Sequence, residues 1–170
     1  MGLGIDVEVL ARARNVVRTD ARFLLERRFT AQELARCRWD PKALLVCYTA
    51  KEAVAKALGV GLDFGGGTGV PCNEVELVLG FEGQPQQVVL SGSALAASRC
   101  IGMRFCFTTW RWNDLWVCAV AVGLGDWQPL SVLGPFLDRA FDAGWASVPR
   151  HDAPHLPAGR STWVVSKTSG

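Results

Sequence analysis

Residues 47–59 read Cys-Tyr-Thr-Ala-Lys-Glu-Ala-Val-Ala-Lys-Ala-Leu-Gly, and this stretch decides the fold. Its apolar residues recur at helical spacing, which predicts that it forms the second half of a helix over residues 42–58 that ends at Gly59. Glu52 and Lys56 are four residues apart and therefore lie on one face of this helix. We expect a carboxylate and an ammonium group side by side there.

The amino-terminal segment supplies a second carboxylate. Residues 3–9 form a short apolar run that predicts a strand, with Asp6 inside it or at its end. Mg²⁺ prefers oxygen ligands and often takes only one or two protein carboxylates together with substrate phosphates. Asp6, Glu52 and Lys56 could therefore hold a divalent cation and a pyrophosphate together. If the chain lacked Asp6, the pair Glu52 and Lys56 would be interpreted as a surface ion pair worth about 0.3–0.5 kcal/mol.

Further elements surround the long helix. The capping-box pattern from Thr30 to Glu33 predicts a helix up to about Arg38. Helical spacing among the arginines predicts another helix over residues 10–25, and six glycines predict a flexible loop over residues 59–71. The remaining expected elements are strands over 74–81 and 86–90, a helix over 91–100, and a hairpin of strands over 103–109 and 115–124.

The composition changes near Asp126. Residues 127–170 hold five of the eight prolines, and they contain one expected short helix, 134–143, and one expected strand, 162–165. We expect a domain over residues 1–126 and a carboxy-terminal extension over 127–170 that packs on it.

Composition also narrows the class of protein. The 170 residues are 49% hydrophobic and 20% charged, which is typical of a folded protein. No apolar run is long enough to span a membrane, and the first residues lack the pattern of a signal peptide, so we expect a cytoplasmic protein that does not bind a membrane. The six cysteines form no Cys-x-x-Cys pair and are expected to be buried thiols, while His151 and His155 are expected in a loop without a metal.

Positive charge gathers between residues 11 and 38. Eight arginines stand there against three acidic residues, a local charge of +5. Such a field steers the association of an acidic partner. Nucleic acid would also suit the charge, but Phe23 and Phe29 look like core positions rather than surfaces on which bases stack, so we expect no nucleic acid.

Four segments resemble the 4'-phosphopantetheinyl transferases, and the small holo-acyl-carrier-protein synthase type most closely. The segments are Gly4-Ile5-Asp6, residues 26–34, residues 50–59 and Gly83-Gln84-Pro85, and their order and spacing hold over about residues 3–122. The residues after Asp126 have no counterpart in the compact members of that family.

The resemblance implies an α+β fold, with a small antiparallel sheet packed on a long central helix. It implies an enzyme that transfers the phosphopantetheine arm of coenzyme A to a serine of an acyl carrier protein. Asp6 and Glu52 would then bind Mg²⁺, and Lys56 would contact the phosphates of coenzyme A. Arg12 falls where the family uses an arginine to grip the carrier, and we add Arg14 and Arg18 to that surface. The resemblance also implies a trimer with active sites between subunits.

Two segments depart from the family pattern. Cys47 and Tyr48 stand where the family usually has an arginine and a phenylalanine. The family expects a Ser-x-Ser-His-Thr segment before its last strand, to hold the nucleotide end of coenzyme A. Residues 108–116 read Thr-Thr-Trp-Arg-Trp-Asn-Asp-Leu-Trp instead. In our alignment Arg111 and Trp112 take the places of the second serine and the histidine.

This altered segment leaves three interpretations open. Arg111 could bind a phosphate while Trp112 stacks on adenine. Alternatively, the nucleotide site is lost, and the tryptophans at 110, 112 and 116, which alternation would place on one face of a strand, line a pocket for an apolar substrate. In the third interpretation these rings pack against the extension.

Three functions follow from these patterns. The first is Mg²⁺-dependent phosphopantetheinylation of a carrier protein that serves fatty-acid, polyketide or peptide assembly, including secondary metabolism. The second is a cyclase or other remodelling enzyme on the same scaffold, which acts on a biosynthetic intermediate without coenzyme A and uses Asp6 or Glu52 as acid or base. The third is a non-catalytic module that binds a carrier protein through its basic residues.

Overall fold

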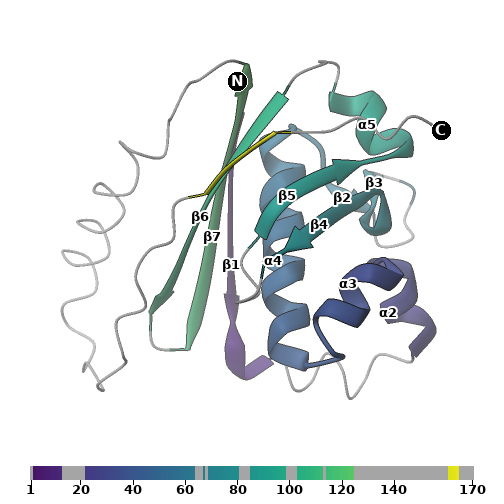
Figure 1. The fold of residues 1–170 in the computed structure, drawn as a ribbon, viewed down its shortest axis with the longest axis vertical. Helices are drawn as coiled ribbons and strands as arrows, with labels where there is room; N and C mark the ends of the chain where they lie inside the picture. The colour runs from purple at the N-terminus through teal and green to yellow at the C-terminus, as the bar shows by residue number, and fades with distance from the viewer. Residues whose placement is uncertain are drawn as a thin grey trace.

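The protein has an α+β fold in which a four-stranded sheet and a two-stranded hairpin both pack against one long helix. A computed structural model describes residues 2–12, 22–63, 67, 69–80, 85–98, 103–112, 114–124 and 161–164. A four-stranded sheet lies along one side of helix α4 (Pro41–Ala57), and the hairpin of strands β4 (Val75–Leu79) and β5 (Pro85–Leu90) lies on the other side (Figure 1). The predicted fold class is confirmed.

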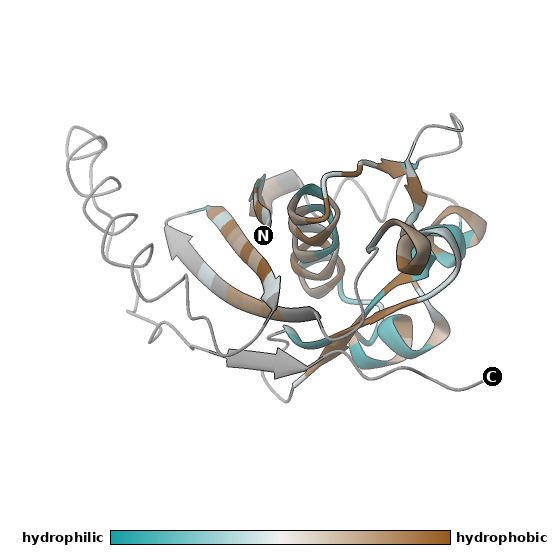
Figure 2. Cartoon of the chain, turned by 90° about the horizontal axis from the view of Figure 1, so that it is seen from above, coloured by the Kyte–Doolittle hydropathy of each residue, from teal (hydrophilic) through white to brown (hydrophobic). Residues whose placement is uncertain are grey.

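Helix α4 follows the predicted boundaries to within one residue. Asp40 caps its first turn by accepting a hydrogen bond from the Ala43 amide at 2.9 Å, and Pro41 occupies the first turn, where no amide donor is needed. The helix ends beside Gly59, whose φ of 74° suits a residue without a side chain. Seen from above, α4 runs between the sheet and the remaining elements (Figure 2).

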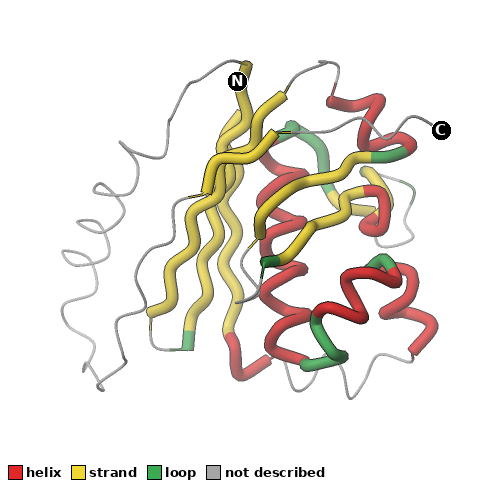
Figure 3. The backbone as a smooth tube through the Cα atoms, viewed as in Figure 1, coloured by secondary structure: helices red, strands yellow, loops and turns green. Residues whose placement is uncertain are grey.

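The large sheet is antiparallel throughout, in the order β1-β7-β6-β8. Its strands are β1 (Gly2–Val9), β6 (Met103–Trp112), β7 (Leu115–Leu124) and β8 (Ser161–Val164). The predicted first strand and final hairpin are confirmed, although β6 continues three residues beyond its expected end. Strand β8 overlaps the strand expected at 162–165, and it pairs with β6 (Figure 3). The helix expected at 134–143 lies outside the described residues.

Two glycines let β1 approach α4 closely. A Cβ atom added at Gly4 would overlap the Ala53 carbonyl oxygen and would lie 2.5 Å from the Ala57 amide nitrogen. One added at Gly2 would overlap the Ala57 carbonyl oxygen. Backbone therefore packs on backbone at this point. The alternation of the strand then turns Asp6 toward the same helix, because residues 2, 4 and 6 share a face.

The remaining elements differ in part from expectation. The capping box is present: the Thr30 amide donates to Glu33 Oε2 at 2.8 Å, and the Glu33 amide donates to Thr30 Oγ1 at 3.3 Å. The loop expected at 59–71 contains a short parallel pair of strands. Of the helix expected over 10–25, the described residues form a 3₁₀ turn at its start and a helix that begins at Arg22, and residues 13–21 lie outside the described part. These elements are η1 (Leu10–Arg12), α2 (Arg22–Arg28), α3 (Ala31–Arg36), β2 (Leu62–Asp63), β3 (Val70–Pro71), η2 (Cys72–Glu74) and α5 (Gly92–Ser98).

Cysteine and membrane expectations can be compared with the structure in part. The cysteines of the described residues, which are all except Cys100, are buried thiols, as predicted. The helices of the described chain are too short or too polar to cross a bilayer. The two histidines lie outside the described ranges.

Candidate active site

The structure brings the three predicted site residues together. Asp6 projects from β1 and Glu52 and Lys56 from successive turns of α4. The Lys56 Nζ atom lies 2.6 Å from Asp6 Oδ1 and 3.7 Å from Glu52 Oε2. Residues 50 positions apart meet here because the glycine contact presses β1 against the helix. One ammonium group therefore sits between two carboxylates.

The Lys56 side chain is more exposed to solvent than the two carboxylates that it contacts. The Lys56 side chain is 47% exposed, whereas Glu52 and Asp6 are 22% and 12% exposed. Partial burial alone would lower the pKa of Lys56, but the hydrogen bond and charge of Asp6, aided by Glu52, outweigh it and raise that pKa above its ordinary value of 10.5. The lysine is thus a cation at neutral pH, and its side chain is accessible to solvent.

The donor set fits Mg²⁺. The carboxylates of Asp6 and Glu52, which face the Lys56 ammonium, offer oxygen atoms only. In the described parts of the chain, no further acidic, cysteine or histidine side chain joins them. Mg²⁺ accepts such an incomplete protein shell, since substrate phosphates and water complete it, whereas Zn²⁺ sites add nitrogen or sulfur ligands. The thiol nearest Asp6 along the sheet is Cys118, and burial together with the Asp6 charge raises the pKa of that thiol. Cys118 therefore stays protonated.

Tyr48 extends the site by one helical turn. Its hydroxyl donates a hydrogen bond to Glu52 Oε1 at 2.8 Å, so the two oxygens of Glu52 face different partners. Burial, the hydrogen bond and the Glu52 charge raise the pKa of Tyr48 well above its ordinary value of 10.0. Our sequence reasoning gave Tyr48 no role beyond its departure from the family phenylalanine. The signal was its position four residues before Glu52.

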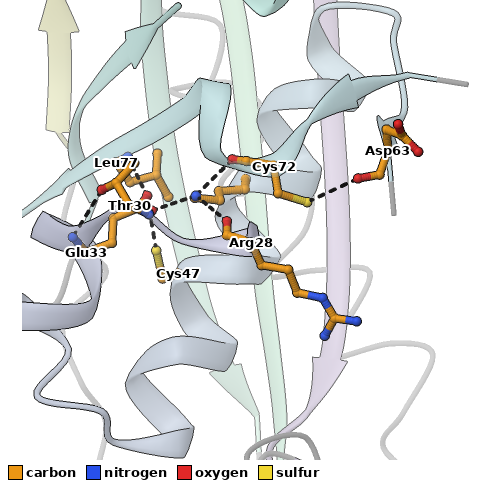
Figure 4. Close-up of polar contacts among 8 residues, drawn as sticks. Arg28, Thr30, Glu33, Cys47, Asp63, Cys72 and Leu77 are labelled. Atoms are coloured by element: carbon orange, nitrogen blue, oxygen red, sulfur yellow. Dashed lines mark hydrogen bonds and ion pairs between the residues drawn. The ribbon is translucent and has the colours of Figure 1, made fainter. Parts of the chain in front are cut away.

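A buried ion pair supports α4 from the other side. Lys51 Nζ lies 2.6 Å from Glu33 Oε2, and both side chains are fully buried. The ammonium also donates to the Arg28 and Cys72 carbonyl oxygens, each at 2.9 Å (Figure 4). The other Glu33 oxygen accepts from the Leu77 amide at 2.8 Å. This cluster joins α2, α3, η2 and β4 to the residue that precedes Glu52, and sequence reasoning missed its burial.

The register of the hairpin corrects one expectation. Trp116 pairs with Arg111, so it is out of step with the positions of Trp110 and Trp112, and the three tryptophans do not share a face. Trp116 is on β7 and is buried against Leu10. The prediction is wrong because the alternation of side chains along β6 does not continue through the turn into β7. The side chains of Arg111 and Trp112 lie outside the described part, so their contacts with coenzyme A stay a prediction.

The predicted carrier-binding arginines are not tested. Arg12 ends η1, which follows β1 directly, but its side chain is not described, and Arg14 and Arg18 lie outside the described residues. The neighbouring helix α2 carries Arg27 and Arg28 in its last turn. The basic character of this part of the chain is a property of the sequence, and its role stays a prediction.

Comparison with known proteins agrees with this geometry. The model of the 4'-phosphopantetheinyl transferase superfamily matches residues 2–120. The chain is similar to a holo-[acyl-carrier-protein] synthase of Roseiflexus castenholzii, 38% identical over 101 residues that make up 59% of this chain and 74% of that protein. It is also similar to one of Chloroflexus aurantiacus, 34% identical over 143 residues, 76% of this chain and 91% of the other.

A solved structure has the same fold. The Helicobacter pylori holo-[acyl-carrier-protein] synthase in complex with coenzyme A aligns with a TM-score of 0.55 and 21% identity, over 71% of this chain and 99% of that one. The family match spans β1, α4 and most of β7, which are the elements that carry Asp6, Glu52 and Lys56. The predicted class of enzyme is confirmed, and the chain belongs to the 4'-phosphopantetheinyl transferase superfamily.

Proposed function

We propose that this protein transfers the 4'-phosphopantetheine arm of coenzyme A to a serine of an acyl carrier protein. The observation that carries the proposal is the meeting of Asp6 and Glu52 around Lys56. In the proposed reaction the serine hydroxyl releases its proton to solvent, and its oxygen forms a bond to the phosphorus that bears the pantetheine arm. The bond from that phosphorus to the adenosine-side phosphate oxygen breaks, and the adenosine bisphosphate leaves.

The side chains of this site suit the charge that the reaction must handle. Asp6 and Glu52 would hold Mg²⁺, which would neutralise the negative charge that builds on the leaving phosphate. Lys56 contacts the phosphates as a second cation, and its raised pKa keeps it charged. Arg111 contributes a further phosphate contact and Trp112 stacks on the adenine, in place of the family's Ser-x-Ser-His-Thr segment.

The carrier protein binds the basic amino-terminal region. Arg12, Arg14 and Arg18 face an acidic surface of the carrier in this proposal, within the stretch that carries a local charge of +5. Because these charges act on the encounter, replacing Arg14 with glutamate should raise the KM for the carrier and leave the turnover of bound carrier nearly unchanged. An equal fall in kcat would contradict a role in docking alone.

The active form is a homo-oligomer, and a trimer by resemblance. Leu3, Ile5 and Val7 project from the face of β1 that turns away from α4, and they are 48%, 37% and 48% exposed. β1 is an edge of the described sheet, and an apolar edge strand is normally covered. A second copy of the chain is the proposed cover. In a sedimentation experiment the wild-type protein should be a trimer, and I5E should be a smaller species. A monomeric wild-type protein would contradict the proposed oligomer.

The decisive experiment combines the protein with coenzyme A, Mg²⁺ and a panel of apo carrier proteins, followed by mass spectrometry of the carriers. D6N and E52Q should each lose the added arm, since either change removes a charge that the metal needs. The matched control is E76Q, which removes a partly exposed carboxylate from β4 on the far side of α4. A folded wild-type protein that modifies no carrier would refute the proposal, as would unchanged activity in both site variants.

The structure offers the remodelling enzyme little support. That alternative needs three tryptophans on one face around a cavity, whereas Trp116 is buried against Leu10 and Leu45 and is out of register with the other two. The same mass measurement also separates the transferase from a non-catalytic module, because a module would bind the carrier without adding mass.

A further inference from the structure

We propose that Tyr48 is a positioning residue that fixes the Glu52 carboxylate and directs its Oε2 atom toward the metal and phosphate site. The inference rests on the proposed function, and it concerns a residue at which this chain departs from the phenylalanine expected by resemblance to the family. The phenol hydroxyl is the added group, and it is the part of Tyr48 that contacts Glu52.

The two carboxylate oxygens of Glu52 have different partners. Oε1 accepts the Tyr48 hydroxyl at 2.8 Å, and Oε2 lies 3.7 Å from Lys56 Nζ. A glutamate side chain on a helix surface has three rotatable torsions, and a hydrogen bond at one oxygen limits the orientations of the other. Tyr48, Glu52 and Lys56 follow one another at intervals of four residues, so a single face of α4 carries the positioning group, the carboxylate and the cation.

The hydroxyl is suited to this task because the ring of Tyr48 packs against the core, which limits the movement of the group that holds Glu52. Hydrogen bonds from outside the ligand shell orient metal-binding side chains, and their loss typically weakens metal affinity by about 10- to 100-fold.

The test measures Mg²⁺ binding by calorimetry in the presence of coenzyme A and without a carrier protein, so no turnover occurs. Y48F removes the hydroxyl and keeps the ring. We expect its Mg²⁺ affinity to fall about 10-fold or more, with coenzyme A binding in the absence of metal unchanged. The Mg²⁺ concentration that half-saturates transfer should rise by a similar factor, while kcat at saturating Mg²⁺ falls less.

The matched control is T49V, one residue further along the helix. Thr49 is also a hydroxyl residue of α4, but it is buried and donates to the Leu45 carbonyl at 2.8 Å, away from Glu52. T49V should bind Mg²⁺ like wild type. Y48F within twofold of wild type would overturn the positioning role, and so would an equal loss in T49V.

E52Q distinguishes this failure from failure of the proposed function. If E52Q loses Mg²⁺ binding while Y48F keeps it, Tyr48 does not position the ligand, and the metal site stands. If E52Q binds Mg²⁺ as tightly as wild type, Glu52 is not a ligand and the positioning role of Tyr48 falls, whereas the transferase function falls only if no carrier gains the arm.

Discussion

Replacing Lys51 with methionine should destabilise the protein strongly, although Lys51 is not predicted to touch any substrate. The change removes the buried ammonium that lies 2.6 Å from Glu33 and that donates to two carbonyl oxygens at 2.9 Å. Breaking a buried ion pair by removing one partner costs about 3–5 kcal/mol, because the other charge stays buried without compensation. Domains are stable by about 5–15 kcal/mol, so K51M loses a large part of the total.

Urea denaturation measures this loss. With a denaturant dependence of about 1–3 kcal/mol per molar urea, the midpoint should fall by about 1 M or more. K42M is the control, since Lys42 is an exposed lysine in the first turn of the same helix, and surface changes of this kind stay within about 0.5 kcal/mol. A loss below about 1 kcal/mol in K51M would show that the pair contributes less than its burial indicates.

The double variant K51M/E33Q tests the cause. Glutamine at position 33 removes the charge that K51M leaves behind, and it keeps an oxygen for the Leu77 amide. Groups in direct contact have interaction energies of about 0.5–3 kcal/mol. The double variant should therefore lose less than the sum of the single losses by an amount in that range. Strict additivity would mean that lost packing, rather than an unpaired charge, explains the single variants.

Two further predictions concern the contact of β1 with α4 and the charge of Lys56. G4A should lose about 1–3 kcal/mol or more in thermal unfolding, because the new methyl overlaps the Ala53 carbonyl, whereas G61A should be nearly neutral, since nothing lies within 4 Å of its added carbon; equal stability of the two would contradict the close packing. A raised pKa keeps the charge of Lys56, and its ion pairs, intact below the ordinary value of 10.5 and loses them only as the pH rises through the higher folded-state value. Binding of coenzyme A to the metal-free protein should therefore show no Lys56-dependent loss up to about pH 10, and a loss at lower pH that K56R removes would refute this.

The sequence could predict the elements that local patterns determine. Asp40 and Pro41 mark the start of α4, Thr30 and Glu33 form the capping box, and alternation marks the strands. The site residues needed more, because no local pattern brings position 6 to position 56. That step came from the resemblance to a family, and the structure gives its physical reason in the close approach of Gly4 to α4.

The buried pair of Glu33 and Lys51 is not predicted from the sequence, because one residue can have two structural roles. Glu33 is a helix cap, as its pattern predicts, but it is also fully buried, and the oxygen that accepts the Thr30 amide, Oε2, is the one that pairs with the buried Lys51 ammonium. Lysine is expected at the surface, so residue type alone does not predict that Lys51 is buried. Yet Leu44, Cys47, Lys51 and Val54 recur at intervals of three and four and are all buried, so the lysine occupies the core stripe of α4. A charged residue within an apolar stripe is the signal for a buried partner of opposite charge, and Glu33 is that partner.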